Sequence, residues 1–256
     1  MRRRGAPAAL WAAALLLALL SGCKKNQPTT LMRGQAQHYY QSGLAHLHRG
    51  DAVLAQQDFQ RAIALDGSQA TFFNALGLAF YAGNDVGRAI AAYEQALRID
   101  PKLSEAHTNL GSAYSTLGDY PRAKQQFEIA LADPKYNGRA AAHYNLGLIA
   151  QEQGDLDLAE RHYAQALQAD PRFYDAAIRR GEMLEHMSRL AEAIQSFELG
   201  LKARSDNLEL TYKLAQLYYA TGQRDRAASY ARSIIQSAAG SEVSMKAVKL
   251  LELMEK

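Results

Sequence analysis

The chain has 256 residues, of which 29 are Lys or Arg and 26 are Asp or Glu, so its formal net charge is +3. The excess comes from Arg2, Arg3 and Arg4, and the rest of the chain is balanced, which removes any whole-chain electrostatic argument for binding nucleic acid or an anionic surface. Cys23 is the only cysteine, so no internal disulfide framework is available.

The N-terminus is predicted to be a secretory signal over residues 1–22. Three arginines precede an apolar run over residues 8–20, which is short of the roughly 20 residues that a membrane span needs. The stretch Leu20-Ser21-Gly22-Cys23 resembles the bacterial lipobox, in which the cysteine thiol takes a diacylglycerol and becomes the first residue after cleavage. The resemblance implies that Cys23 anchors the protein in a membrane. Because Lys24, and not Asp, follows the cysteine, it further implies the outer membrane, with the chain facing the periplasm. The alternative is an uncleaved inner-membrane anchor.

Residues 23–34 are expected to form the lipidated cysteine and a flexible polar tether. After them, small residues recur with steps of 34, 34, 36, 34 and 34, at Gly43, Gly77, Gly111, Gly147, Gly181 and Ala215. The same steps relate a series of alanines, at Ala55, Ala89, Ala123, Ala159, Ala193 and Ala227. An aromatic series keeps pace through Phe59, Tyr93, Phe127, Tyr163 and Phe197 and lapses only at Ala231.

This pattern resembles the tetratricopeptide repeat over residues 35–240. The resemblance implies an all-α, right-handed superhelix of six helical hairpins, in which the small residues let paired helices approach and the aromatic fills the space between one hairpin and the next. Turns inside the hairpins are indicated by Gly50, Gly118, Gly154 and Gly222, and helix ends by Pro101 and Pro171. Residues 241–256 have apolar positions at helical spacing and are predicted to form a capping helix.

The search for catalytic motifs gives no candidate. None of the seven histidines belongs to a zinc-protease pair, no serine has a nucleophile setting, and no phosphate loop is present. His107 and His143 share one repeat position, where a bulky residue is expected to pack against the neighbouring hairpin. The sequence therefore predicts a protein that is not an enzyme, with no cofactor, no metal and no small-molecule substrate.

The inner face of the superhelix is the expected binding surface, lined by first-helix residues at fixed places in each repeat. The candidate partner-binding groove is apolar and lies on the first two repeats, with Tyr40, Leu44, Leu47, Asn74, Leu78 and Tyr81. The third repeat offers a polar inner face, with Glu105, Thr108, Ser112 and Ser115, and the fifth an acidic one, with Asp175, Glu182 and Glu185. An extended or helical peptide held by side-chain anchors suits this groove. The alternative for any single residue is packing against a neighbouring repeat.

The step of 36 marks an insertion between the third and fourth repeats. There Asp133, Pro134 and Tyr136 form a linker that resembles the one in the type IV pilus outer-membrane lipoproteins, the pilotins, and the myxobacterial social-motility lipoproteins among them. The resemblance implies a helper that binds subunits of the secretin, the outer-membrane pore of the pilus, brings them to the outer membrane and promotes their multimerisation for pilus-dependent motility. It also implies that the contact lies on the early repeats.

Two other functions share the anchor and the repeats. One is an envelope adaptor lipoprotein that recruits peptidoglycan hydrolases or proteases, and the other is a subunit of the outer-membrane protein insertion machinery. The linker favours the pilotin, whereas co-purification of a hydrolase would favour the adaptor.

Overall fold

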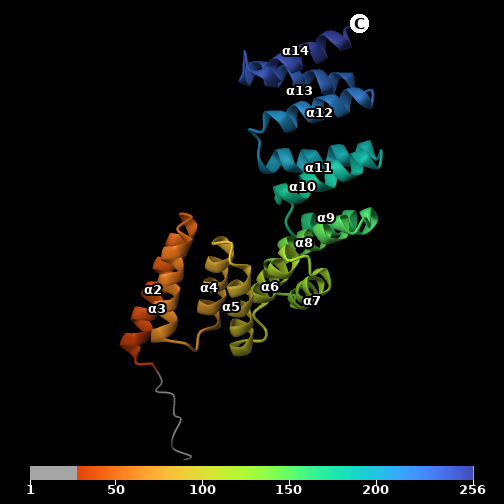
Figure 1. Cartoon of the computed structure of the whole chain (residues 1–256). Coiled ribbons are helices and arrows are strands. Elements are labelled where there is room, and N and C mark those ends of the chain that lie inside the picture. Colours follow the sequence, from red (N-terminus) through yellow and green to blue (C-terminus); the bar gives the residue numbers. More distant parts are fainter. Residues whose placement is uncertain (1–27, 256) are drawn as a thin grey trace, which may run out of the picture.

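The computed structural model describes residues 28–255, so the predicted signal and Cys23 lie outside the described residues. The described part consists of thirteen α-helices, labelled as in Figure 1. Their bounds are α2 Thr30–His48, α3 Ala52–Leu65, α4 Ala70–Ala82, α5 Val86–Ile99, α6 Ser104–Thr116, α7 Tyr120–Leu131, α8 Arg139–Glu152, α9 Leu156–Ala169, α10 Tyr174–His186, α11 Leu190–Ala203, α12 Leu208–Ala220, α13 Arg224–Ser237 and α14 Glu242–Met254. None of these helices is long and apolar enough to cross a membrane.

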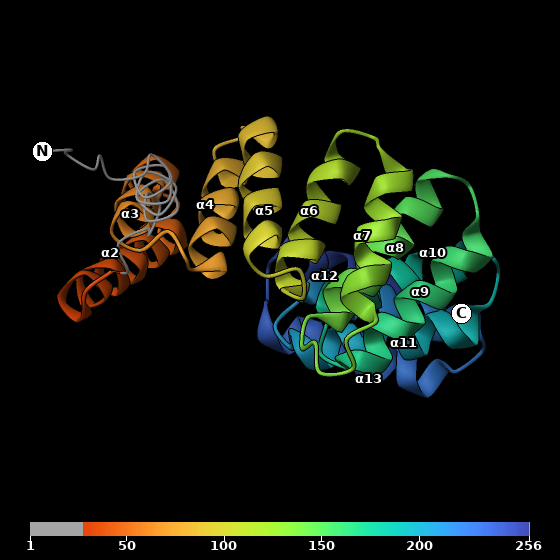
Figure 2. The ribbon, with the colours of Figure 1, turned by 90° about the horizontal axis from the view of Figure 1, so that it is seen from below.

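The helices form six hairpins, from α2/α3 to α12/α13, followed by the single helix α14. Each second helix also contacts the first helix of the next hairpin, so the hairpins stack in chain order. Figure 1 shows this stack as one continuous curve with α2 and α14 at its two ends, and Figure 2 shows the later hairpins curling behind the earlier ones. The predicted all-α superhelix of consecutive repeats is confirmed.

A glycine and an aromatic ring join the two helices of each of the first five hairpins. A β-carbon on Gly43 would lie 2.6 Å from the ring of Phe59, and one on Gly111 would lie 2.9 Å from the ring of Phe127. Since both residues of each pair belong to one hairpin, the ring makes a contact that the expectation of a ring between one hairpin and the next did not include. The ring first fills the contact within its own repeat.

The sixth hairpin replaces both partners of this pair at once. Ala215 stands at the glycine position and Ala231 at the aromatic position, and both are fully buried. A methyl group at the first position excludes the ring at the second, so the two substitutions compensate each other. An aromatic contact is supplied nearby, where the rings of Tyr218 and Tyr230 stack at 5.5 Å.

The turns within the hairpins all place one residue in the left-handed backbone region. Glycine holds this position in four repeats, with φ between 74° and 85°. In the second and fifth repeats the position belongs to Asn84, with φ of 62°, and to Ser188, with φ of 60°. The predicted glycine turns are therefore present, and two turns with another residue at this position use the same conformation.

Helix α2 begins at Thr30, where the sequence predicted tether as far as residue 34. The Thr29 hydroxyl caps the helix by accepting a hydrogen bond from the Met32 N–H at 3.2 Å. At the other end of the chain, α14 packs on α12 and α13 and buries Ala247 and Leu250, as a capping helix does.

Candidate functional site

The first helices of neighbouring hairpins contact one another in succession, α2 with α4, α4 with α6 and α6 with α8. This brings the predicted groove residues of the first two repeats together on adjacent helices. Tyr40, Leu44, Leu47 and Leu78 are all half-buried and pack against one apolar cluster. These partly exposed apolar side chains on the adjacent helices α2 and α4 are the ones that the sequence predicts to bind a partner, and we call their surface the N-terminal groove.

Tyr40 serves both the groove and the packing between the first two hairpins. Its ring stacks on Phe72 of α4 with ring centroids 4.9 Å apart, and burial raises the pKa of its phenol. The alternative of packing against a neighbouring repeat thus applies to this residue, although part of its ring remains accessible.

Asn74 and Tyr81 make polar contacts to the next first helix, α6. The Asn109 side-chain N–H donates to Asn74 Oδ1 at 2.9 Å, and the Tyr81 and Thr116 hydroxyls lie 2.7 Å apart. Tyr81 is 36% exposed, so its ring stays available to a partner while its hydroxyl is held. Sequence reasoning missed Asn109 and Thr116, although each stands 35 residues after its partner.

The third repeat shows how the linker reshapes the inner face. The hydroxyl of Tyr136 donates to Thr108 Oγ1 at 2.8 Å, and both side chains are buried. Thr108 stands at the repeat position that Tyr40 and Tyr144 occupy in the first and fourth repeats. The expected polar face is therefore wrong at Thr108, because an aromatic ring from the linker covers it. Burial also raises the pKa of the Tyr136 phenol.

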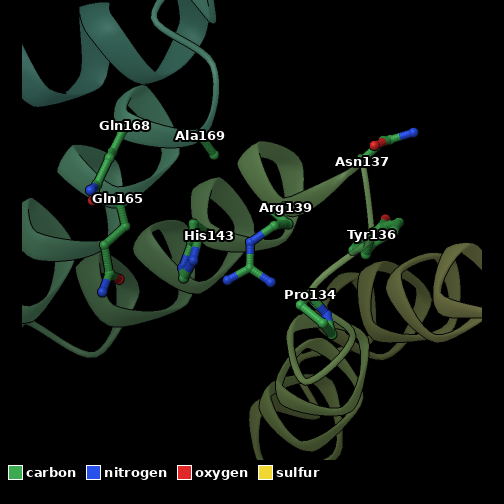
Figure 3. A pocket seen from close by; sticks show the side chains of 8 residues that line it. All are labelled: Pro134, Tyr136, Asn137, Arg139, His143, Gln165, Gln168 and Ala169. Carbon is green, nitrogen blue, oxygen red and sulfur yellow. The ribbon is translucent and has the colours of Figure 1, made fainter.

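The linker itself is fixed by hydrogen bonds to both neighbouring helices. Ser104 of α6 donates to Asp133 Oδ2 at 3.3 Å, and Arg139 Nη1 of α8 donates to the Asp133 carbonyl at 3.3 Å. The same Nη1 also donates to the Leu131 carbonyl at the end of α7, at 2.8 Å. Next to it lies a polar cavity of about 530 Å³ (Figure 3), bordered by the linker, α8 and α9. The Arg139 guanidinium, which caps the end of α7, projects beside it.

The two histidines singled out by sequence contact the second helix of their own hairpins, and His107 Nε2 also lies 3.1 Å from the Pro101 carbonyl between the second and third hairpins. His107 Nδ1 lies 2.7 Å from Gln126 Oε1 of α7, whereas the ring of His143 stacks on His162 of α9 at 5.8 Å. The Nδ1 atoms of His143 and His162 are buried without hydrogen-bond partners. Burial, then the neighbouring His162 and Arg139, lowers the pKa of His143 to about 4.

The acidic inner face of the fifth repeat is partly neutralised. Glu185 forms an ion pair with Lys213 at 2.8 Å, and Glu182 lies 3.7 Å from Arg179. Asp175 is exposed and enters no ion pair within residues 28–255. Over the same residues, no group of three or more His, Cys, Asp or Glu side chains is arranged to hold a metal ion.

Comparisons with known proteins agree with this geometry. Sequence families described as TPR repeat or tetratricopeptide repeat match residues 77–118, 108–171, 144–207 and 184–250. No curated protein matches the chain in sequence.

Solved structures give a similar picture of the fold. A structure from a functional characterisation of Pseudomonas aeruginosa pilF is 23% identical, with a TM-score of 0.68, and the match covers 88% of this chain and 99% of that one. PilW, described as a widely conserved type IV pilus biogenesis factor, is 22% identical with a TM-score of 0.63, covering 83% and 98%. YrrB, described as a TPR protein with an unusual peptide-binding site, is 22% identical with a TM-score of 0.52, covering 75% and 97%.

The matched families together span residues 77–250, and the hairpins of the first two repeats follow the same pattern. Such folds typically serve as scaffolds for protein interaction. The chain is a tetratricopeptide-repeat protein.

Proposed function

We propose that this protein is a lipid-anchored assembly factor that binds subunits of the type IV pilus secretin through its N-terminal groove. Cys23 would hold it at the outer membrane, and binding would promote localisation and multimerisation of the secretin.

The observation that carries the proposal is the extent of the likeness to PilF and PilW. Nearly the whole of each of those chains, 99% and 98%, aligns with most of this one, so the likeness extends over the full length of the two solved structures. The resemblance of the Asp133-to-Tyr136 linker to that of the pilotins supports the same family. In the structure this linker makes specific contacts with α6 and α8, as expected of a feature with a defined role in the fold.

The N-terminal groove suits a peptide with apolar anchors. Its apolar side chains are half-buried and backed by the core, so they are held in place before a partner arrives. The exposed ring of Tyr81 at its edge is the type of residue that contributes strongly to binding.

The first experiment is an immunoblot for heat- and detergent-resistant secretin multimers in cells from which the gene is deleted. The proposal predicts that multimers vanish while monomers persist, and that the wild-type gene restores them. Unchanged multimers would contradict it, and crosslinking would then test the envelope adaptor, whose partners are peptidoglycan hydrolases or proteases.

Variants separate the anchor from the groove. Cys23→Ala is expected to leave helicity unchanged and to move the protein out of the membrane fraction; normal fractionation would contradict the anchor. Tyr81→Glu with Leu44→Glu is expected to weaken secretin binding. The matched control is Val53→Glu with Leu54→Glu on α3, where two exposed apolar side chains, 65% and 45% accessible, lie outside the groove. Equal binding by both double variants, with equal helicity, would move the site elsewhere.

A further inference from the structure

Helix α14 forms a wall of a second pocket on the inner face, in addition to covering the last hairpin. Its inner-face residues are Lys246, Leu250 and Leu253. They stand 34 places after Tyr212, Gln216 and Tyr219 of α12 and so continue the register of the first helices. A cavity of about 370 Å³ lies between the two helices. It is lined by Tyr212, Gln216, Tyr219, Lys246, Lys249, Leu250 and Leu253. We call it the C-terminal pocket.

The floor of the C-terminal pocket is apolar and accessible. Leu253 is 54% exposed, and the pocket is also lined by the partly buried rings of Tyr212 and Tyr219. The amide of Gln216 adds a group that can both donate and accept hydrogen bonds. Apolar walls with a few polar groups around them are typical of sites that fix one ligand side chain and its orientation.

The charged side chains that line the C-terminal pocket are both positive, although the carboxylates of Glu242 and Glu209 act on Lys246 from outside the lining. No carboxylate lines it, and both charged residues are lysines. Lys246 is held by Glu242, with Nζ 2.9 Å from Oε1, whereas Lys249 makes no ion pair within residues 28–255. An anionic group entering the pocket therefore meets one ammonium group that no described carboxylate already neutralises.

Another cavity along the stack shows a different charge pattern. The cavity between α8, α9 and α10, about 230 Å³, is lined by both Arg179 and Glu182, which lie within ion-pairing distance of each other. A charged ligand there would have to compete with the ion pair of Arg179 and Glu182. A ligand at Lys249 meets no such competing ion pair.

We propose that the C-terminal pocket binds a peptide segment that carries an apolar side chain next to a carboxylate. The apolar side chain packs on Leu250, Leu253 and the tyrosine rings, and the carboxylate pairs with the Lys249 ammonium group. A peptide is the expected occupant because the pocket places apolar side chains, which can anchor a side chain, next to an ammonium group, which can pair with a carboxylate. The site goes beyond the proposed secretin contact, since it lies at the opposite end of the stack from α2 and α4 (Figure 1).

The test uses two matched synthetic peptides, N-acetyl-Leu-Leu-Asp-amide and N-acetyl-Leu-Leu-Lys-amide, titrated into the protein labelled at leucine methyl groups for NMR. The proposal predicts that the acidic peptide shifts the signals of Leu250 and Leu253 and that the basic peptide binds more weakly. Lys249→Gln should weaken binding of the acidic peptide about threefold to fivefold, as the loss of one exposed ion pair implies. Lys249→Glu should reverse the preference between the two peptides.

The control variant is Lys202→Gln on α11, which removes an exposed lysine outside the pocket and should leave both affinities unchanged. Equal affinity for the two peptides, no shift at Leu250 and Leu253, or an unchanged preference in Lys249→Glu would each overturn the proposal. Secretin multimers should persist in cells carrying Lys249→Glu. Failure of the C-terminal pocket is thus distinguishable from failure of the secretin contact at the N-terminal groove.

Discussion

Gly111 and Phe127 are in such close contact that a β-carbon on the glycine would lie 2.9 Å from the ring. The same relationship recurs in the first five hairpins, and the sixth avoids the conflict by having alanine at both positions. The close approach of the paired helices therefore depends on a small residue opposite a large one.

Gly111→Ala is expected to destabilise the protein by about 1–3 kcal/mol, because the added methyl group must displace a fully buried ring. Phe127→Ala alone should cost about 3–5 kcal/mol through the cavity it leaves. The double variant, which copies the sixth hairpin, should cost less than the sum, because the methyl group no longer meets a ring. Chemical denaturation of the four proteins measures this coupling.

The matched control is Gly87→Ala, at an open helical position, which should be neutral or stabilising. Strict additivity of the two changes would contradict the explanation.

Ser188→Gly is expected to raise the free energy of unfolding by about 1 kcal/mol. Ser188 has a φ of 60°, where a side chain is strained, and four other repeats place glycine there. The reverse change, Gly118→Ser in a turn of the same kind, should lower stability by a similar amount. Thermal unfolding of both variants provides the check, and a destabilised Ser188→Gly would show that the hydroxyl has a role of its own.

Mild acid is expected to destabilise the fourth hairpin through His143 and His162. Burial lowers the pKa of both rings, that of His143 from 6.5 to about 4, so the unfolded chain binds more protons than the folded one between these values. The free energy of unfolding should therefore rise with pH across this window and fall on acidification. The expected loss on acidification is about 2 kcal/mol, which allows for the rings being only partly buried.

His162→Gln should reduce this pH dependence and raise stability at pH 7. The third repeat already contains the resulting pair, in which His107 Nδ1 lies 2.7 Å from Gln126 Oε1. Urea unfolding at pH 7 and pH 5 measures the effect. His48→Gln, at an exposed position on α2, is the control and should leave the pH dependence as it is. An unchanged pH dependence in His162→Gln would rule out the histidine pair as its source.

A mostly buried ion pair joins the fourth and fifth hairpins, at positions that hold apolar side chains where the second and third hairpins meet. Arg180 Nη2 lies 2.6 Å from Glu160 Oε1, and Arg180 also donates to Ser196 Oγ at 2.9 Å. The corresponding residues of the second and third repeats are Ile90 and Leu110. Arg180→Leu alone should cost about 3–5 kcal/mol, because it leaves the Glu160 carboxylate unpaired.

The double variant Arg180→Leu with Glu160→Ile copies the apolar junction and should be neutral or more stable than the wild type. Calorimetric unfolding of the single and double variants distinguishes the two cases. A double variant as unstable as Arg180→Leu would mean that the ion pair itself is required at this junction.

The sequence by itself determined the repeat, its helices and its turns. Each of these depends on residues close together in the chain, such as Gly43 with the aromatic sixteen residues later, so a regular step was enough to place them. The same regularity placed Tyr40, Leu44 and Leu78 on one face, because residues at equal repeat positions lie on equivalent sides of successive helices. Their role in binding a partner stays a prediction.

Only the tertiary structure decided which side chains meet across repeats. Three contacts depend on how the hairpins stack. They are the hydrogen bond of Tyr136 to Thr108, the hydrogen bond of Asn109 to Asn74 and the ion pair of Arg180 with Glu160. The pocket formed by α14 belongs to the same class, since a capping helix acquires an inner face only from its position beside α12. Local spacing specifies each hairpin, whereas the distance and angle between hairpins result from the packing of all their interfaces together.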